Sequence, residues 1–261
     1  MKKITILLAV IILFAASQSY SQMLPVPKVT LHVTGGYGMP TGNFKQDVPT
    51  DSRADADYFP YYTKQLINFG ADGKLALGTR GNFRVTLGAT YNMFSNDVTA
   101  LLRPAQGQAG VAVNFKPKVN VMSIALGGEW AFAPTQKVNP YVGLGLAANF
   151  FSGKFEFGQS VYVKGAQRSG PMDMKSETRI GVILDAGADF RLSRTVGAIL
   201  GVKYHFINPL GKGADDPSEI GPNEIDLGDM EHTEDGNYFP ARTVSSVNVY
   251  AGVSFYFGLM K

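Results

Sequence analysis

The stretch Arg179–Leu192, RIGVILDAGADFRL, indicates the fold because an apolar side chain occupies every second position. The apolar set is Ile180, Val182, Leu184, Ala186, Ala188, Phe190 and Leu192, and the alternate set is charged or glycine apart from Ile183. Successive side chains of a strand point to opposite faces, so this strand has one apolar and one polar face. A strand this much longer than the average of about six residues suits a tilted crossing of ~25 Å of hydrocarbon.

The same alternation recurs along the chain. The clearest repeats are Phe83–Met93 and Ser246–Phe257, and less regular ones cover about 28–38, 65–77, 119–132, 140–151 and 196–207. Together with the first stretch they make eight strands. The sequence therefore predicts an all-β fold of eight antiparallel strands in up-and-down order.

Two closed architectures fit eight such strands. A soluble barrel such as a lipocalin directs its apolar face inward, and a transmembrane barrel directs it toward lipid. Here the polar face has few lysines or glutamates but many glycines, namely Gly88, Gly143, Gly145, Gly181, Gly187, Gly201 and Gly252. A crowded eight-stranded interior needs small residues beside large polar ones. We therefore expect a transmembrane β-barrel with a polar interior and a lipid-facing apolar exterior.

Composition excludes several classes of protein. The 261 residues include no cysteine, so there is no disulfide, thiolate metal site or thiol nucleophile. Charged residues make up 17%, below the roughly 25% of soluble domains. The formal charge of +3 is too small to indicate nucleic-acid binding, and we expect no cofactor.

The N-terminus has the pattern of an export signal. Lys2 and Lys3 precede an apolar run, Ile4–Ala16, which is followed by small and polar residues. We expect a signal peptide at 1–21, cleaved after Ser21 or less favourably at Ser17, and one barrel domain at 22–261. Export and the barrel together predict the outer membrane of a Gram-negative cell.

The connections between strands alternate in length. Short ones lie at 78–82, 134–139 and 193–195, and long ones at about 39–64, 95–117, 157–178 and 208–242. Outer-membrane barrels keep short turns in the periplasm and long loops outside, so we expect periplasmic termini and four extracellular loops. Two aromatic belts are predicted, one from Tyr58, Phe59, Tyr61, Tyr62, Phe94, Tyr238 and Phe239, the other from Trp130, Phe132, Phe255 and Phe257.

The opening Val29–Gly38, VTLHVTGGYG, and the closing Val253–Phe257, VSFYF, resemble the small eight-stranded outer-membrane barrels. This group includes the OmpA membrane domain and the opacity-type, porin-like surface proteins. The resemblance covers about Lys28 to Phe257. It implies outer-membrane lipid and lipopolysaccharide as surroundings, recognition of the last strand by the barrel-assembly machinery, and a monomer. Four residues, Gly258–Lys261, follow the final phenylalanine, which departs from the pattern.

Register predicts a network of charged side chains in the lumen. Its members are Asp72, Lys74, Arg84, Glu129, Arg179, Asp185, Asp189, Arg191, Lys203 and His205. Buried charges must pair or be costly. A turn centred on Arg194 places Asp185 opposite Lys203, and we predict that these two pair. Lys74, Arg84 and Glu129 should form a second cluster.

The segment Gly211–Arg242 has nine acidic residues against two basic ones. Clustered carboxylates suit hard cations, so a weak cation-binding loop is a candidate, formed by Asp226, Asp229, Glu231, Glu234 and Asp235. The spacing fits an EF-hand poorly, because Thr233 and Arg242 stand where ligands belong. A solvated acidic loop is the favoured interpretation, and no metal is predicted.

These features leave three functions open. The leading hypothesis is a structural, adhesive or surface-binding role in which the loops meet an unknown external ligand. The alternative is a narrow porin for small solutes or ions. The least favoured is a lipid A-modifying enzyme, whose deacylase form needs a lipid-facing histidine and serine. His205 points inward and position 207 is Ile207, so we expect no enzyme.

Overall fold

The computed structural model describes residues 24–45, 61, 63–102, 111–158, 161–163, 166–168, 170–213, 221, 223–234 and 237–259. The predicted signal peptide and three of the predicted belt residues, Tyr58, Phe59 and Tyr62, lie outside these ranges. Within them, no helix is long and apolar enough to cross a membrane.

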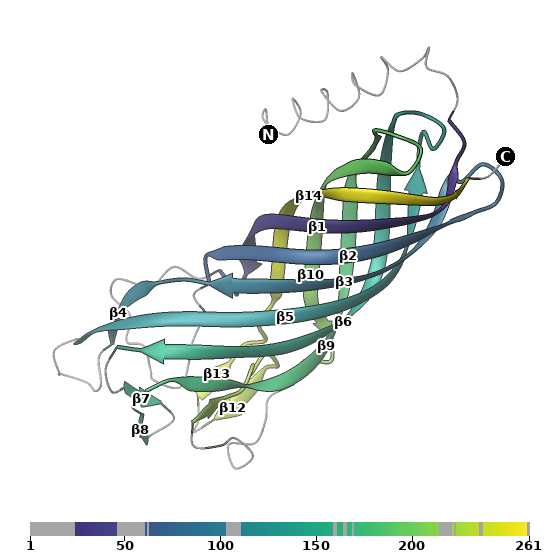
Figure 1. Ribbon diagram of the computed structural model, residues 1–261. Coiled ribbons are helices and arrows are strands. Elements are labelled where there is room, and N and C mark those ends of the chain that lie inside the picture. Colours follow the sequence, from purple (N-terminus) through teal and green to yellow (C-terminus); the bar gives the residue numbers. More distant parts are fainter. Residues whose placement is uncertain are drawn as a thin grey trace, which may run out of the picture.

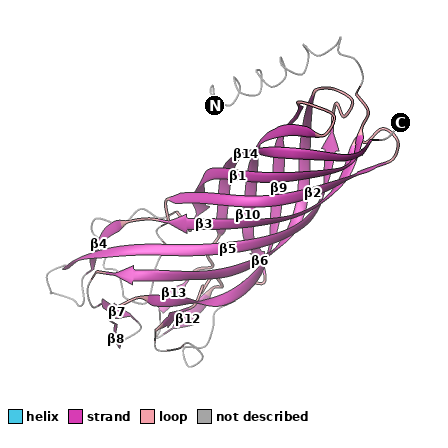
Figure 2. Cartoon of the chain, in the orientation of Figure 1, coloured by secondary structure: helices cyan, strands magenta, loops and turns pink. Residues whose placement is uncertain are grey.

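Eight long strands close into an antiparallel barrel, as predicted (Figures 1 and 2). They are β1 (Pro27–Gly42), β2 (Gln65–Leu77), β3 (Phe83–Ser95), β5 (Val111–Ala131), β6 (Val138–Phe157), β9 (Met172–Arg191), β10 (Val196–Leu210) and β14 (Val244–Leu259). Each pairs with its neighbour in the chain, while β14 pairs with β1 and so joins the two ends of the sheet. Closure removes the unpaired edges that an open sheet would expose.

Side chains alternate between the two faces as the sequence predicts. Large apolar residues on the outer face are exposed, with Leu126, Leu144 and Leu146 each about 60% exposed. Inward positions are polar and buried, as at Thr30 and Asn68. The apolar exterior and polar interior of the predicted membrane barrel are therefore confirmed over the middle of the strands.

The strands differ strongly in length. At about 3.3 Å per residue, the 21 residues of β5 run roughly 70 Å, far more than the ~25 Å apolar band requires. In Figure 1, β5, β6 and β9 continue past β2 and β3 at the end that carries the long connections. We call this end the loop end and the opposite one the turn end.

The predicted loops 95–117 and 157–178 are therefore partly strand, which corrects the sequence interpretation. The alternation continues there with inverted polarity. Phe115 and Val119 point inward and are buried, while Lys116 and Lys118 point outward and are exposed. Beyond the bilayer the outer face meets water, so the apolar side chains move inside.

In the described part of the chain, six short strands lie at the loop end. They are β4 (Val98–Leu102), which pairs with β5; the hairpin of β7 (Val161–Val163) and β8 (Ala166–Arg168); β11 (Glu224–Ile225), parallel to β9; and the hairpin of β12 (His232–Glu234) and β13 (Asn237–Phe239). The turn end has only tight connections, where Gly78 and Gly81 adopt φ values of 68° and 65° that favour glycine.

One of the two predicted aromatic belts lies on the outer surface, and of the second belt the structure describes the side chains of Tyr61 and Phe94 alone. Trp130, Phe132 and Phe257 are exposed at the turn end. Tyr61 and Phe94, predicted for the second belt, are buried inside the loop end instead. The outward aromatic side chains on that side come from mid-strand positions, namely Tyr37, Phe69, Tyr91, Phe150 and Tyr204.

Candidate functional site

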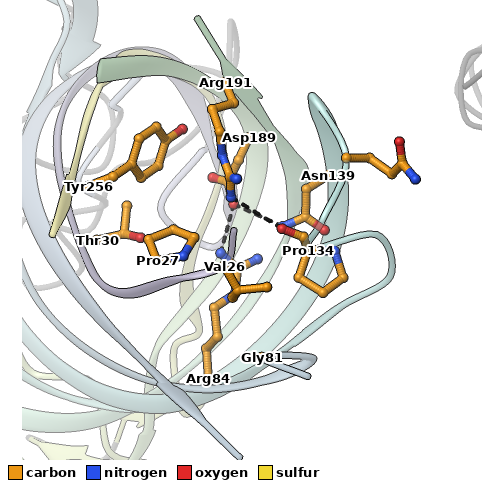
Figure 3. Close-up of a pocket in the computed structure, with 11 residues that line it drawn as sticks. Val26, Pro27, Thr30, Gly81, Arg84, Pro134, Asn139, Asp189, Arg191 and Tyr256 are labelled. Carbon is orange, nitrogen blue, oxygen red and sulfur yellow. Dashed lines mark hydrogen bonds and ion pairs between the residues drawn. The ribbon is translucent and has the colours of Figure 1, made fainter. Parts of the chain in front are cut away.

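The turn end of the lumen is closed by the segment before β1. The Leu24 amide donates to the Thr135 carbonyl at 2.8 Å, which ties this segment to the β5–β6 turn. The Arg191 guanidinium donates to the carbonyl oxygens of Pro25 at 2.8 Å and Pro134 at 3.2 Å. Figure 3 shows Arg191 reaching across the barrel end toward Pro134, with Asp189 beside it. The residues of this closure line a cavity of about 10 Å³, roughly room for one water molecule.

Above this closure lies a buried charged cluster of Lys74, Arg84, Glu129 and Asp189. Lys74 Nζ and Arg84 Nη2 each lie 2.6 Å from a Glu129 oxygen. Arg84 Nη1 also donates to Asp189 Oδ2 at 2.8 Å, and Lys74 Nζ lies 3.7 Å from Asp189 Oδ1. Two cations and two anions thus alternate, which offsets the cost of removing each charge from water.

A histidine and a serine adjoin the charged cluster. His32 Nδ1 shares a 2.8 Å hydrogen bond with Ser254 Oγ, and His32 Nε2 lies 3.9 Å from Asp189 Oδ1. The sequence does not predict this contact, which arises because β1–β14 pairing places His32 directly opposite Ser254. Ser254 is 0% exposed, so the hydroxyl has no access for a substrate.

The middle of the lumen holds a small chamber of about 50 Å³. Its charged lining is Asp72, Lys74, Glu129, Asp185 and Lys203. Asp185 lies opposite Lys203 in the β9–β10 register, as predicted. The two do not form an ion pair in the described part of the chain. The Tyr250 hydroxyl donates to Asp185 at 2.7 Å instead, and Lys203 Nζ lies 5.2 Å from the centroid of the Tyr250 ring.

Between the chamber and the loop end lies a layer of polar side chains, which we call the amide ring. It consists of Asn68, Asn92, Ser123, Asn149, His205, Ser246 and Asn248, all buried. Asn149 Nδ2 donates to the Ile207 carbonyl at 2.7 Å, beside the irregular pairing of β9 with β10. Asn92 Nδ2 donates to the Val121 carbonyl at 3.3 Å, across the neighbouring strand. Asn92 thus links the neighbouring strands β3 and β5, whereas Asn149 on β6 reaches past β9 to β10.

The loop end is closed by an apolar cap and a polar clamp. The apolar cap is a packed cluster of Phe44, Tyr61, Leu66, Phe94, Phe115, Val119, Val121, Phe151, Phe155, Met172, Met174, Ile207, Ile225, Leu227 and Val244. Burial raises the pKa of the Tyr61 hydroxyl. Because the cap joins residues of the barrel to residues of its connections, it holds the connections over the bore.

The clamp is built on Asp229, which is 0% exposed. Its carboxylate accepts two-pronged hydrogen bonds from Arg179 and a 2.7 Å hydrogen bond from Asn208 Nδ2. The Gly213 amide donates to the same carboxylate at 3.0 Å. Arg179 also pairs with Glu177. The clamp therefore pins the start and the middle of the connection between β10 and β14 to the barrel wall.

The outer face of the loop end carries paired charges. Lys116 Nζ lies 2.9 Å from Asp97 Oδ2, and this hydrogen bond raises the pKa of Lys116. Lys118 Nζ donates to Glu156 at 2.8 Å and so lowers the pKa of Glu156. Both pairs are solvent-exposed, and exposed pairs contribute little to stability.

The predicted lumen residues thus lie at five levels. Arg191 lies in the turn-end closure; Lys74, Arg84, Glu129 and Asp189 form the charged cluster; Asp72, Asp185 and Lys203 line the chamber; and His205 and Arg179 belong to the amide ring and the clamp. The clamp is not predicted by the sequence, because the acidic composition of 211–242 favours a solvated loop for Asp229.

Of the five candidate cation-binding residues, the structure describes the side chains of Asp226, Asp229 and Glu231. Asp229 is engaged by Arg179, and Asp235 lies outside the described residues. Where the chain is described, no group of three or more metal-ligating side chains could hold an ion.

The model of the OmpW family matches residues 63–214, more than half of the chain. No curated protein matches. Among solved structures, OprG from Pseudomonas aeruginosa is similar at 13% identity and a TM-score of 0.47, covering 91% of this chain and 99% of that chain.

Two further solved structures are similar at a comparable level. Neisserial surface protein A has 13% identity and a TM-score of 0.46, covering 88% of this chain and 97% of that chain. Ail, the attachment invasion locus protein of Yersinia pestis, has 12% identity and a TM-score of 0.40, covering 87% of this chain and 99% of that chain.

Proposed function

The chain belongs to the OmpW family of outer-membrane barrels, and from this premise we propose that it is a closed barrel with a structural or adhesive role. The observation that supports this role is the filling of the lumen at both ends. The charged cluster and the apolar cap lie at opposite ends of the bore, with the chamber and the amide ring between them. A solute would have to break buried ion pairs and unpack the cap in order to pass.

A closed barrel leaves its exposed ends to carry the function. The loop end offers the β7–β8 and β12–β13 hairpins and a charged outer wall on β5 and β6. We propose that this end faces outside the cell and meets the external ligand, whereas the turn end faces the periplasm. The signal peptide at 1–21 is part of the same proposal.

Planar-bilayer recording tests the closed lumen. The refolded full-length chain should give no steady open channel. Large, stable conductance steps would instead support the narrow porin, for which the 50 Å³ chamber between Asp185 and Lys203 is the favourable observation.

Cells that lack the protein separate the structural from the adhesive role. A structural role predicts sensitivity to detergent, and an adhesive role predicts loss of cell-to-cell aggregation. A variant without 161–168, the β7–β8 hairpin, is then expressed in these cells. If the role is structural, the variant should restore detergent resistance. If the role is adhesive, it should fail to restore aggregation. Unchanged behaviour in both assays would contradict the proposal.

We also propose that the chain is not an enzyme. His32, Ser254 and Asp189 adjoin one another, but all three are buried. Asp189 is held by Arg84 at 2.8 Å, a much closer contact than its 3.9 Å approach to His32. This geometry supports a role of the three side chains in packing the lumen.

A further inference from the structure

We infer that the rim at the turn end binds negatively charged phospholipid headgroups through Lys28, Arg80, Lys137 and Arg194. This inference rests on the placement of the chain in an outer membrane and is independent of whether the lumen is closed.

The four basic residues are spread around the rim. Lys28 lies at the start of β1, Arg80 in the β2–β3 turn, Lys137 in the β5–β6 turn and Arg194 in the β9–β10 turn. Four of the five described segments of chain at the rim thus supply one exposed cation each. All four side chains are exposed.

No exposed acid neutralises these cations within the described rim, which comprises 24–30, 76–84, 130–140, 189–197 and 253–259. Its one acidic residue is Asp189, which is buried and bound to Arg84. The outer wall of the loop end differs, because Lys116 and Lys118 there are paired with Asp97 and Glu156. The positive charge of the described rim is therefore not neutralised by an exposed acid of the same rim.

The position of the cations matches the headgroup level. Exposed apolar side chains flank them, with Leu77 and Phe83 on either side of Arg80 and Leu192 two residues before Arg194. Lysine and arginine beside apolar surface extend their charged ends toward the polar interface. Near an anionic membrane surface, one such cation favours a charged lipid about fivefold.

The single tryptophan provides a local reporter. Trp130 is 50% exposed on the outer face and pairs with Phe83, three residues from Arg80. It also lies on β5, the strand that leads into the turn with Lys137. Trp130 therefore senses lipids that these two cations would bind, whereas Lys28 and Arg194 lie on rim segments that do not adjoin β5.

The experiment measures quenching of Trp130 fluorescence by brominated lipid. The full chain is reconstituted in phosphatidylcholine vesicles that contain a minor fraction of brominated phosphatidylglycerol or, separately, brominated phosphatidylcholine. We expect an apparent preference of about fivefold for phosphatidylglycerol, decreasing as salt is added. Equal quenching by the two lipids would overturn the inference.

Two matched pairs of substitutions locate the effect. R80Q/K137Q should abolish the preference, and K28Q/R194Q, which removes the same charge elsewhere on the rim, should leave it unchanged. A preference that survives R80Q/K137Q, or falls equally in both pairs, would contradict local binding. Displacement of brominated phosphatidylglycerol by lipopolysaccharide would also overturn the assignment to phospholipid. A conducting lumen would not affect any of these readings, so failure here is distinct from failure of the proposed function.

Discussion

At the scale of single residues, the lumen is organised by charge pairing. Period-two alternation was sufficient to place Lys74, Arg84 and Glu129 in one cluster, because register alone sets which side chains point inward. It could not assign Asp185 a partner, since the competing donor, Tyr250, comes from a strand far away in the sequence. The Asp229 clamp also could not be predicted from the sequence, because only the closed barrel brings its partners together.

Neutralising one member of the charged cluster should strongly destabilise the fold. Glu129→Gln leaves Lys74 and Arg84 buried with Asp189 as their remaining anion, and removing one partner of a buried ion pair costs about 3–5 kcal/mol. Urea unfolding in vesicles measures the free energy of unfolding. The matched control is Glu156→Gln, which breaks the exposed pair with Lys118 and should change the free energy of unfolding little. Equal effects of the two variants would contradict the account.

The trio of His32, Ser254 and Asp189 should be catalytically silent. A serine-reactive fluorophosphonate probe should leave the folded protein unlabelled, because the Ser254 hydroxyl is fully buried. Labelling is measured by mass spectrometry of the intact chain. Modification that disappears in Ser254→Ala would show an active nucleophile and refute the non-enzymatic proposal.

At the scale of elements, β5, β6 and β9 extend farther at the loop end than the sequence indicated. The rule that apolar side chains face outward located eight strands. It fails beyond the point where the apolar side chains change from the outer face to the inner face. In β6, Phe150 faces outward, whereas Phe151 and Phe155 join the apolar cap and Lys154 and Glu156 face water. A continuous period of two with a change of apolar face is the signal that would extend the strand.

Closure of the barrel depends on close approach of β1 and β14. A Cβ at Gly252 would collide with the Val33 carbonyl and lie 2.9 Å from Thr34 Cα. Gly252→Ala should therefore destabilise the barrel by about 1–3 kcal/mol and lower the refolded fraction measured by heat-modifiable gel mobility. Gly35→Ala lies on the same strand pair, where the nearest atom is 3.6 Å away, and should refold normally. The opposite order would contradict the register.

The clamp should hold the connection after β10 against the barrel. Asp229→Asn removes the charge that binds Arg179 and weakens the hydrogen bonds to Asn208 and Gly213. Loss of about 1.4 kcal/mol or more of local stability would speed amide hydrogen exchange at least about tenfold. The Arg242 amide, which donates to the Asp229 carbonyl, is the reporter. Glu224→Gln, an exposed change in the same connection, should leave its exchange unaltered.

At the scale of the whole molecule, two parts of the one barrel have opposite polarity. The membrane part has an apolar shell and a charged bore, and the projecting part has a polar shell and an apolar cap. The sequence predicts the polarity of the membrane part because lipid imposes a regular pattern over many strands. The polarity of the projecting part depends on connections folding back into the mouth, which no local pattern encodes.

The central claim is that the bore is sealed at both ends, and cysteine accessibility tests it most directly. The chain has no cysteine, and Ser123 is a buried member of the amide ring between the charged cluster and the apolar cap. Ser123→Cys in vesicles should resist a charged, water-soluble thiol reagent, whereas the exposed controls Ser152→Cys and Ser193→Cys should react fully. Rapid labelling of the cysteine at position 123 in a folded barrel would demonstrate a water path through the lumen and contradict the account.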